Sequence, residues 1–213
     1  MSRYFVGMTG ASGQIYGERL IRALVAAGHE VDLALSPAAC KVLPHELGVQ
    51  VGKDGSKLGA CLAGWLGSEV AAHVRTFGTD AIEAPASSGT SGIKAVLICP
   101  CSMGTLARVT AGYSSNLVER AADVALKERR TLVLVPRETP LSEIHLENML
   151  KLRRMGTVIL PAMPGFYALP QSIEELVDHV VGKVLDSIGV EHEVGAHWQG
   201  MPQPSAEDPG LEL

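Results

Sequence analysis

Short apolar runs and longer stretches with helical spacing alternate along this chain of 213 residues. The helical stretches keep apolar side chains on one face, as in the last of them, where Val177, Val180 and Val184 fall on one side. Apolar strands that alternate with helices are typical of a parallel sheet with both faces covered. The pattern predicts strands at residues 4–8, 31–35, 95–99, 132–135 and 158–160, and helices at 15–27, from Pro37, at 103–111, at 142–154 and from Ile173 to Ile188.

These elements are expected to form one α/β domain, a Rossmann-like doubly wound parallel sheet arranged as a flavodoxin-like three-layer sandwich. A chain of this length buries one substantial core, and no compositional break divides it. Residues 47–59 and 84–92, which are rich in Gly, Ser and Pro, are predicted to be loops. Residues 1–189 are therefore expected to form the functional domain. Residues 190–213, with three prolines and little periodicity, are expected to form a C-terminal tail.

Composition narrows the class of protein and its compartment. A net charge of -5 argues against a general nucleic-acid surface, and no apolar run reaches the length of a membrane-spanning helix. The N-terminal apolar run is too short for a secretion signal, so a cytoplasmic protein is expected. The four cysteines match no metal-ligand spacing, so no metal site is predicted and buried free thiols are the favoured interpretation.

Charged residues gather on both sides of the predicted strand at residues 132–135. Arg120 and Lys127 are close to two helical turns apart and share a face with Asp123 between them. The strand then delivers Arg137 and Glu138 at its carboxyl end, where open α/β sheets gather ligands. A cation beside a carboxylate there indicates an anion site with a proton-transfer group. The alternative is a solvated helix face followed by a charged turn.

Glycine and serine follow other predicted strands. The turn from Gly10 to Gly13 lies between the first strand and the first helix, where backbone N–H groups can approach a phosphate. It lacks the full dinucleotide fingerprint, so a mononucleotide fits better. Ser36 and Ser102 add hydroxyls at the same edge of the sheet. Each serine alone is more often a helix cap, and the glycine turn alone is as consistent with an ordinary tight turn.

Several motifs carry a resemblance to a known family: Met8-Thr-Gly-Ala-Ser-Gly13, Cys99-Pro-Cys-Ser-Met-Gly-Thr105, the run that begins Asn116-Leu-Val-Glu-Arg, and Pro164-Gly-Phe-Tyr167. Together they resemble the UbiX-type flavin prenyltransferases, over nearly everything from Arg3 to about Gly189. The resemblance implies that reduced FMN binds at the glycine turn and the strand ends. The positions that match FMN-binding residues of the family are Gly10, Ala11, Ser12, Ser36, Ser102, Met103, Gly104, Thr105 and Arg137.

The family also implies a second anion site, for the phosphate of dimethylallyl monophosphate. The chain has no aspartate cluster of the kind that binds magnesium and a prenyl diphosphate, so a cationic cradle without metal is expected. The positions that match this site are Lys127, Arg137, Glu138, Tyr167 and Lys183, and Arg120 is placed in the same substrate-binding set.

Three positions depart from the family pattern. Lys183 stands where the family usually has arginine, Ala81 where some members have tryptophan, and Pro37 where a lysine is common. These departures leave the flavin site intact and bear on the affinity for the donor and on its chain length. His145 and Asn148, one helical turn apart, are able to cap a helix or line the pocket, and a structural role is favoured for the histidine.

The resemblance implies a reaction in which the dimethylallyl group leaves its phosphate, bonds to flavin N5 and closes a ring onto C6. Ser12 and Glu138 are candidates for proton transfer, and Glu46, expected just after the helix that starts at Pro37, matches a glutamate contributed across a subunit interface. The product, prenylated FMN, would serve a UbiD-type decarboxylase, and the family commonly forms dodecamers. Two alternatives stay open: an FMN-dependent enzyme like the cysteine decarboxylases, and a non-catalytic flavin carrier or accessory subunit of a decarboxylase.

Overall fold

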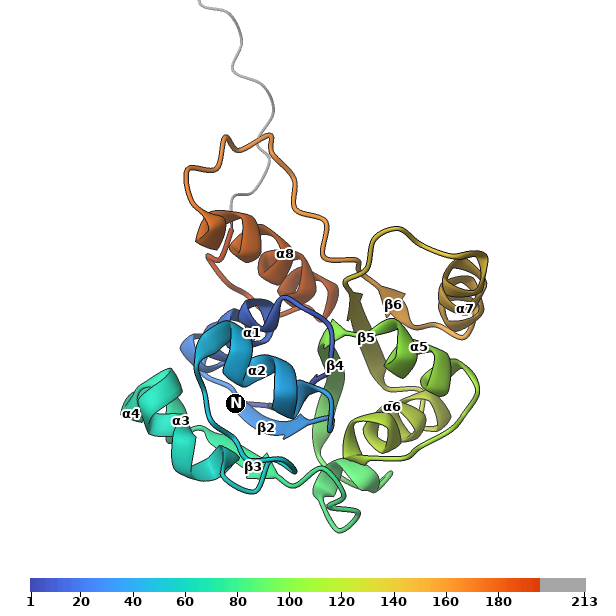
Figure 1. Cartoon of the computed structure of the whole chain (residues 1–213), viewed down its shortest axis with the longest axis horizontal. Helices are drawn as coiled ribbons and strands as arrows, with labels where there is room; N and C mark the ends of the chain where they lie inside the picture. The colour runs from blue at the N-terminus through green and yellow to red at the C-terminus, as the bar shows by residue number, and fades with distance from the viewer. Residues whose placement is uncertain (196–213) are drawn as a thin grey trace, which may run out of the picture.

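Six parallel strands form the centre of the computed structural model, which describes residues 1–195 (Figure 1). Most of the predicted tail at 190–213 lies outside the described residues, so the boundary at residue 189 stays a prediction. The strands are short and apolar, as burial on both faces requires. They are β1 (Arg3–Met8), β2 (Glu30–Leu35), β3 (Val74–Phe77), β4 (Ile93–Cys101), β5 (Thr131–Pro136) and β6 (Val158–Ile159).

The order of the strands determines where a ligand can bind. They lie in the order β3-β2-β1-β4-β5-β6, so the winding of the chain reverses between β1 and β4. Paired residues such as Met8 with Leu35, and Cys101 with Pro136, bring the carboxyl ends of neighbouring strands to one edge. In doubly wound sheets, the crevice outside the carboxyl ends at such a reversal is the usual ligand site. The predicted doubly wound parallel sheet is therefore confirmed.

Helices cover both faces of the sheet and complete three layers (Figure 1). Each helix turns an apolar stripe toward the strands. None of the helices that the structure describes is long and apolar enough to cross a membrane. One face carries α1 (Gln14–Ala26), α2 (Ala39–Leu47), α3 (Leu58–Leu66), α4 (Ser68–Ala71) and α8 (Ile173–Ser187); the other carries the short 3-10 turn η1 (Pro85–Ser87), α5 (Met103–Thr110), α6 (Leu117–Lys127) and α7 (Glu143–Arg154).

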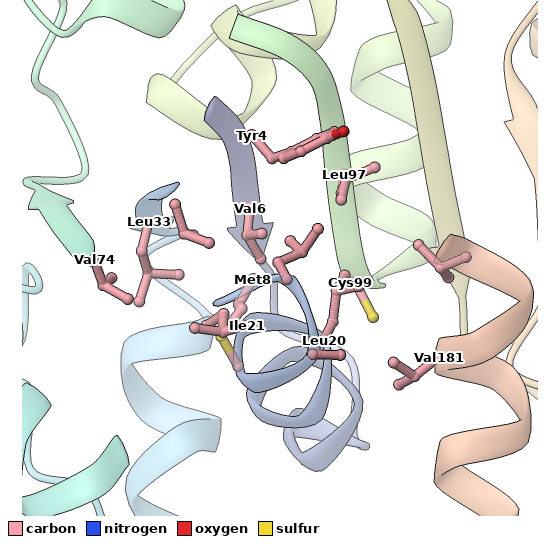
Figure 2. Close-up of a cluster of buried hydrophobic side chains, with 14 of the residues drawn as sticks. Tyr4, Val6, Met8, Leu20, Ile21, Leu33, Val74, Leu97, Cys99 and Val181 are labelled. Carbon is pink, nitrogen blue, oxygen red and sulfur yellow. The ribbon is translucent and has the colours of Figure 1, made fainter. Parts of the chain in front are cut away.

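Alternate side chains of each strand pack into two cores, one on either face of the sheet. Tyr4, Val6 and Met8 of β1 face the layer of α1 and α8, where Figure 2 shows Leu20 among them. Phe5, between them in sequence, belongs to the core beneath α5 and α6. Because successive side chains of a strand point to opposite faces, both sets must be apolar. This explains the continuous apolar runs from which the strands were predicted.

The sequence did not predict α3, α4 or β3. The nine residues of α3 are apolar on every side and include Gly59 and Gly64, so no amphipathic period is visible. Burial of Leu58, Leu62 and Leu66 in the core stabilises this helix instead. β3 has only four residues, and Arg75 interrupts its apolar pattern. The short turn η1 falls within the predicted loop at 84–92, and α6 was predicted only from the helical spacing of Arg120 and Lys127. The remaining elements begin and end within a few residues of their predicted bounds.

Candidate functional site

Three hydroxyl side chains join the carboxyl ends of β1 and β4, where the strand order reverses. Thr9 Oγ1 accepts a hydrogen bond from the Ser102 N–H (2.7 Å) and donates one to the Pro100 carbonyl (2.9 Å). Ser102 caps α5, because its Oγ accepts a hydrogen bond from the Thr105 N–H (3.3 Å). These bonds hold the first turn of α5, with Met103 buried and Gly104 exposed, at the edge of the crevice. Sequence analysis missed Thr9, although its position directly after the β1 run was an available signal.

The glycine turn after β1 presents backbone donors to the same crevice. Gly13 has a φ of 101°, in the left-handed region that favours glycine. The buried Gln14 side chain donates through Nε2 to the carbonyls of Thr9 (2.8 Å) and Ala11 (2.7 Å). The N–H groups of residues 10–12 donate to no other described residue. The turn therefore keeps its carbonyls occupied and offers N–H groups, which is the donor arrangement that a phosphate or a flavin carbonyl requires.

A carboxylate of the same chain caps the N-terminus of α1. Glu46 Oε2 accepts hydrogen bonds from the N–H groups of Gly13 (2.9 Å) and Gln14 (2.8 Å). A negative charge is favourable at this end of a helix. The sequence prediction that Glu46 follows the helix is wrong, since the residue lies in the last turn of α2. Because Glu46 already occupies two of the helix amides, an FMN phosphate would rely on the rest of the turn and on the neighbouring hydroxyls.

Arg137 extends from the end of β5 over the glycine turn. Its Nε donates a hydrogen bond to the Ser12 carbonyl at 3.1 Å. Burial raises the pKa of Tyr16, and the nearby Arg137 charge opposes part of that increase. Ser36, at the end of β2, is buried and accepts a hydrogen bond from the Ala39 N–H at 3.2 Å. The structure therefore brings the glycine turn and Arg137 together, and Ser36 lies at the same edge, hydrogen-bonded to the first residue of α2.

Glu138 comes next in the chain and points into an exposed region. Its Oε1 accepts a hydrogen bond from the Thr139 N–H at 3.0 Å. The exposed side chain leaves this carboxylate accessible to a ligand at the end of β5. Its neighbour Arg137 supplies a positive charge beside it. The pair has the position that the sequence predicted, at the carboxyl end of a strand.

Among the described residues, Arg120 and Lys127 form ion pairs with acidic residues near them in sequence and form no hydrogen bond or ion pair with Arg137. Arg120 forms an ion pair with Asp123 (2.8 Å), and Lys127 forms one with Glu128. Lys127 precedes β5 and Arg137 follows it, so the strand separates them. A six-residue strand is about 20 Å long, too far for two side chains to hold one phosphate. A site that uses both residues needs a second copy of the chain.

Tyr167 and Lys183 are linked through a residue that sequence analysis did not single out. Tyr167 lies in the exposed stretch between β6 and α8, with its Oη 3.2 Å from His179 Nε2. His179 and Lys183 are one turn apart on α8, and Lys183 Nζ lies 3.3 Å from an Asp186 oxygen. Burial and the Lys183 charge lower the pKa of His179. The spacing of four residues between His179 and Lys183 was the available sequence signal.

The cysteines and His145 have structural roles. Cys99 and Cys101 are buried free thiols at the end of β4. Burial raises the pKa of Cys101 to about 12 and raises that of Cys99 as well. Thiols that stay protonated are poor nucleophiles. The prediction of buried free thiols holds for Cys40, Cys99 and Cys101, while Cys61 is only partly buried. His145 forms a capping box with Ser142 at the start of α7, where Ser142 Oγ accepts its N–H at 3.3 Å.

Comparisons with known proteins agree with this geometry. The family model described as Flavoprotein matches residues 2–185. The flavin prenyltransferase UbiX of Pseudomonas aeruginosa is 50% identical over 196 residues, which are 92% of this chain and 93% of that protein. The flavin prenyltransferase UbiX of Methanothermobacter thermautotrophicus is 45% identical over 195 residues, which are 92% and 94% of the two chains.

Solved structures show the same relationship. The crystal structure of AnUbiX (PadA1) in complex with FMN and dimethylallyl pyrophosphate matches with a TM-score of 0.82 at 38% identity, covering 94% of this chain and 99% of that one. A dodecameric FMN-dependent UbiX-like decarboxylase from Escherichia coli O157:H7 matches at 0.80 and 42%, covering 93% and 100%. The chain therefore belongs to the flavoprotein family. Within that family it is a member of the UbiX-type flavin prenyltransferases.

The cysteine decarboxylase alternative has much weaker relatives. The FMN-dependent cysteine decarboxylase TvaF matches with a TM-score of 0.59 at 18% identity. A likeness at that identity shows the shared fold alone. The comparisons therefore favour the prenyltransferases over the cysteine decarboxylases by a wide margin of sequence identity.

Proposed function

We propose that this chain transfers a dimethylallyl group from dimethylallyl monophosphate to reduced FMN and yields prenylated FMN. The observation that carries the proposal is the donor set at the β1–β4 reversal. There the glycine turn, the α5 cap and Arg137 meet at one edge of the sheet. The close similarity to flavin prenyltransferases over 92% of the chain supports the same reaction.

The residues at the crevice fit FMN. The N–H groups of residues 10–12, which have no acceptor among the described residues, suit phosphate or carbonyl oxygens. Ser36, Ser102 and Thr105 add hydroxyls, and Arg137 adds a positive charge. When bound, reduced flavin supplies the nucleophile that accepts the allyl carbon. Because the side chains around the glycine turn are small, the planar flavin ring can lie close to the backbone there.

The donor phosphate is held by cations from more than one copy of the chain. Arg137 lies at the flavin edge, while Tyr167 and Lys183 lie together on the α8 side. Lys127 comes from α6 of a neighbouring copy, because β5 separates it from Arg137 in its own chain, and Arg120 on the same helix face is assigned with it. Several cations neutralise the charge that develops as the allylic C–O bond breaks and the phosphate leaves with the electron pair. The dodecameric relative supports a homo-oligomer, and we propose a dodecamer here.

Proton transfer is assigned to the carboxylates beside the glycine turn. Glu46 contacts the N–H of Gly13, next to Ser12, and Glu138 follows Arg137 directly. A carboxylate and a hydroxyl at this edge can take a proton from the flavin and return one to the allyl group. The phosphate released from the donor lies near Glu138 and can act as a further base.

The product is proposed to serve a separate UbiD-type decarboxylase. A modified flavin has value only as a cofactor, so this enzyme must pass it to a partner that uses it. We also propose a cytoplasmic location. Four free thiols support a reducing compartment.

The proposed reaction is tested by anaerobic incubation of the protein with reduced FMN and dimethylallyl monophosphate. Mass spectrometry of the extracted flavin is expected to show FMN heavier by one five-carbon unit, with release of one phosphate per flavin. The same assay with the diphosphate decides which donor is used, since the structural relative AnUbiX was crystallised with dimethylallyl pyrophosphate. Unmodified flavin bound to folded protein would instead favour the flavin-carrier alternative. Oxidation of a cysteine-containing peptide with release of carbon dioxide would favour the cysteine decarboxylase alternative.

A further inference from the structure

His179 connects α8 to the segment that carries Tyr167. Its Nδ1 accepts a hydrogen bond from the Gly165 N–H at 3.2 Å, and its Nε2 lies 3.2 Å from Tyr167 Oη. The two rings meet edge to face, with centroids 5.5 Å apart and planes at 77°. This is a favourable arrangement for aromatic rings. One imidazole thus contacts both the backbone and the ring of the same three-residue stretch.

The two contacts determine the protonation state of the imidazole. A backbone N–H always donates, so Nδ1 must be the unprotonated nitrogen. A neutral imidazole then carries its proton on Nε2, which donates to Tyr167 Oη. The phenolic proton of Tyr167 is therefore directed away from His179. A histidine protonated on both nitrogens loses the contact with Gly165, because two N–H groups would face each other.

Gly165 packs closely against the side chains of Tyr167 and His179. A Cβ on Gly165 would lie 3.0 Å from Tyr167 Cε1 and 3.2 Å from His179 Nε2. Both distances are shorter than ordinary van der Waals contact, so only glycine fits without movement. The ring of Tyr167 is otherwise exposed, in a stretch without helix or strand. Gly165 and His179 therefore both contribute to fixing its direction.

We propose that His179 is a positioning residue for Tyr167 that sets the direction of its hydroxyl toward the phosphate of the prenyl donor. This inference rests on the proposed function, in which Tyr167 binds that phosphate. His179 itself does not touch the donor. It holds the loop through Gly165 and the phenol through Nε2, and Lys183 one turn further along α8 supplies the charge.

The arrangement makes donor binding depend on pH. Burial and the charge of Lys183 lower the pKa of His179. The neutral form is present above the ordinary histidine pKa of about 6.5, and the contact is lost as pH falls through the lower value in the folded protein. The charged or titratable groups around His179 are Lys183, Glu175 and Asp178 on α8, Tyr167 on the preceding segment, and Glu193 on the segment after α8, which line or adjoin a cavity of about 290 Å³.

Three variants test the inference. His179→Phe keeps a ring beside Tyr167 but removes both hydrogen bonds, so the donor KM is expected to rise about fivefold, as for the loss of one net hydrogen bond. His179→Gln restores a donor to Tyr167 and cannot titrate, so its KM should return toward the wild-type value. In a Tyr167→Phe background, His179→Phe should add little, because the two residues act through one hydroxyl.

His29 provides a matched control at the opposite edge of the sheet. It also packs against a tyrosine ring, Tyr4, at 5.2 Å, and its Nδ1 also accepts a backbone N–H, from Ser2. Its pKa is likewise lowered by burial. His29→Phe should leave the donor KM and its pH profile unchanged. The donor phosphate ionises near pH 6 in every variant, so the readout is the difference between wild type and His179→Phe.

Three results would overturn the inference: a wild-type donor KM for His179→Phe, effects that multiply fully with Tyr167→Phe, or the same pH profile with and without the imidazole. A failure of the proposed function gives a different result, because wild-type protein would then make no prenylated flavin. In that case ¹⁵N-histidine NMR still tests the underlying arrangement, the contacts of His179 with Gly165 and Tyr167, without activity. An Nε2–H tautomer for His179 supports it, and an Nδ1–H tautomer contradicts it.

Discussion

At the scale of single residues, a few polar contacts with distinct roles define the edge of the sheet where FMN is proposed to bind. Glu46 caps α1 through the N–H groups of Gly13 and Gln14, and the proposed function also gives this carboxylate a role in proton transfer. Arg137 contacts the Ser12 carbonyl from the other side. A structural role and a chemical role for Glu46 make different demands, because capping requires an acceptor oxygen and proton transfer requires a titratable one.

Glu46→Gln separates these two roles. The amide oxygen can still accept from Gly13 and Gln14, so the free energy of unfolding should fall by only about 1 kcal/mol or less. Prenyl transfer should fall by about 100-fold or more if the carboxylate transfers a proton. Glu46→Ala is the companion variant and should lose stability as well. Denaturant unfolding and single-turnover flavin analysis measure the two effects. Full activity in the glutamine variant would limit Glu46 to a capping role.

At the scale of elements, an ion pair between the buried Glu119 and the partly exposed Arg108 joins α5 to α6 behind the crevice. The Glu119 carboxylate is fully buried and accepts hydrogen bonds from Arg108 Nε (2.5 Å) and from the N–H (2.8 Å) and hydroxyl (2.7 Å) of Ser115. Thr105 belongs to the first turn of α5, and Arg108 lies one helical turn further along. The pair therefore fixes α6 relative to the helix end that faces the flavin. Burial tends to raise the pKa of Glu119, but the Ser115 and Arg108 bonds outweigh it and lower the pKa overall.

Glu119→Gln should reduce the free energy of unfolding by about 1.5–3 kcal/mol near neutral pH, as for loss of charged hydrogen bonds. The folded pKa is lowered, so the stability from ionised Glu119 is present above the unfolded value of about 4.3 and is lost as pH falls through the folded value. The difference between variant and wild type should therefore shrink in acid. Urea unfolding at matched protomer concentration measures it, with the exposed Glu83→Gln as control. A difference that does not change with pH would contradict this account.

The same scale shows what the sequence could predict. Largely apolar runs identified β1, β2, β4 and β5, because strands buried on both faces favour apolar residues. The exception is Asp32 of β2, a buried carboxylate that forms ion pairs with Arg3 and Arg75. The turn serines and Arg137 were found because they directly follow such strands. α3 and β3 were missed, since their stability comes from packing and not from a local pattern. Thr9 and His179 were missed although the sequence held a signal for each, because their roles become clear only from partners distant in the chain, Ser102 and Tyr167.

At the scale of the whole molecule, the predicted phosphate cradle is spread over separate regions of one chain. Arg137 lies at the carboxyl edge of the sheet and Lys127 near the amino edge. Large apolar side chains are also exposed on α7 and on the stretch before α8. Patches of this kind mark protein contacts. Both features agree with a site completed by a neighbouring copy, and the exposed apolar residues are Ile144, Leu146, Leu150, Met155, Met163, Phe166, Leu169 and Ile173.

The most direct test of this account mixes two inactive variants. Lys127→Ala and Arg137→Ala are each expected to lose prenyl transfer, because each removes one cation from the leaving phosphate. If a site takes Lys127 from one copy and Arg137 from another, random co-assembly restores complete sites. Co-expression of the two variants at equal levels should therefore recover about a quarter of the wild-type yield of prenylated FMN.

Each variant oligomer alone and a mixture formed without subunit exchange are the controls, and native mass spectrometry establishes co-assembly. Recovery of prenylated FMN only in the co-assembled sample is the predicted result. Co-assembled oligomers that stay as inactive as their parents would contradict a flavin prenyltransferase site shared between copies.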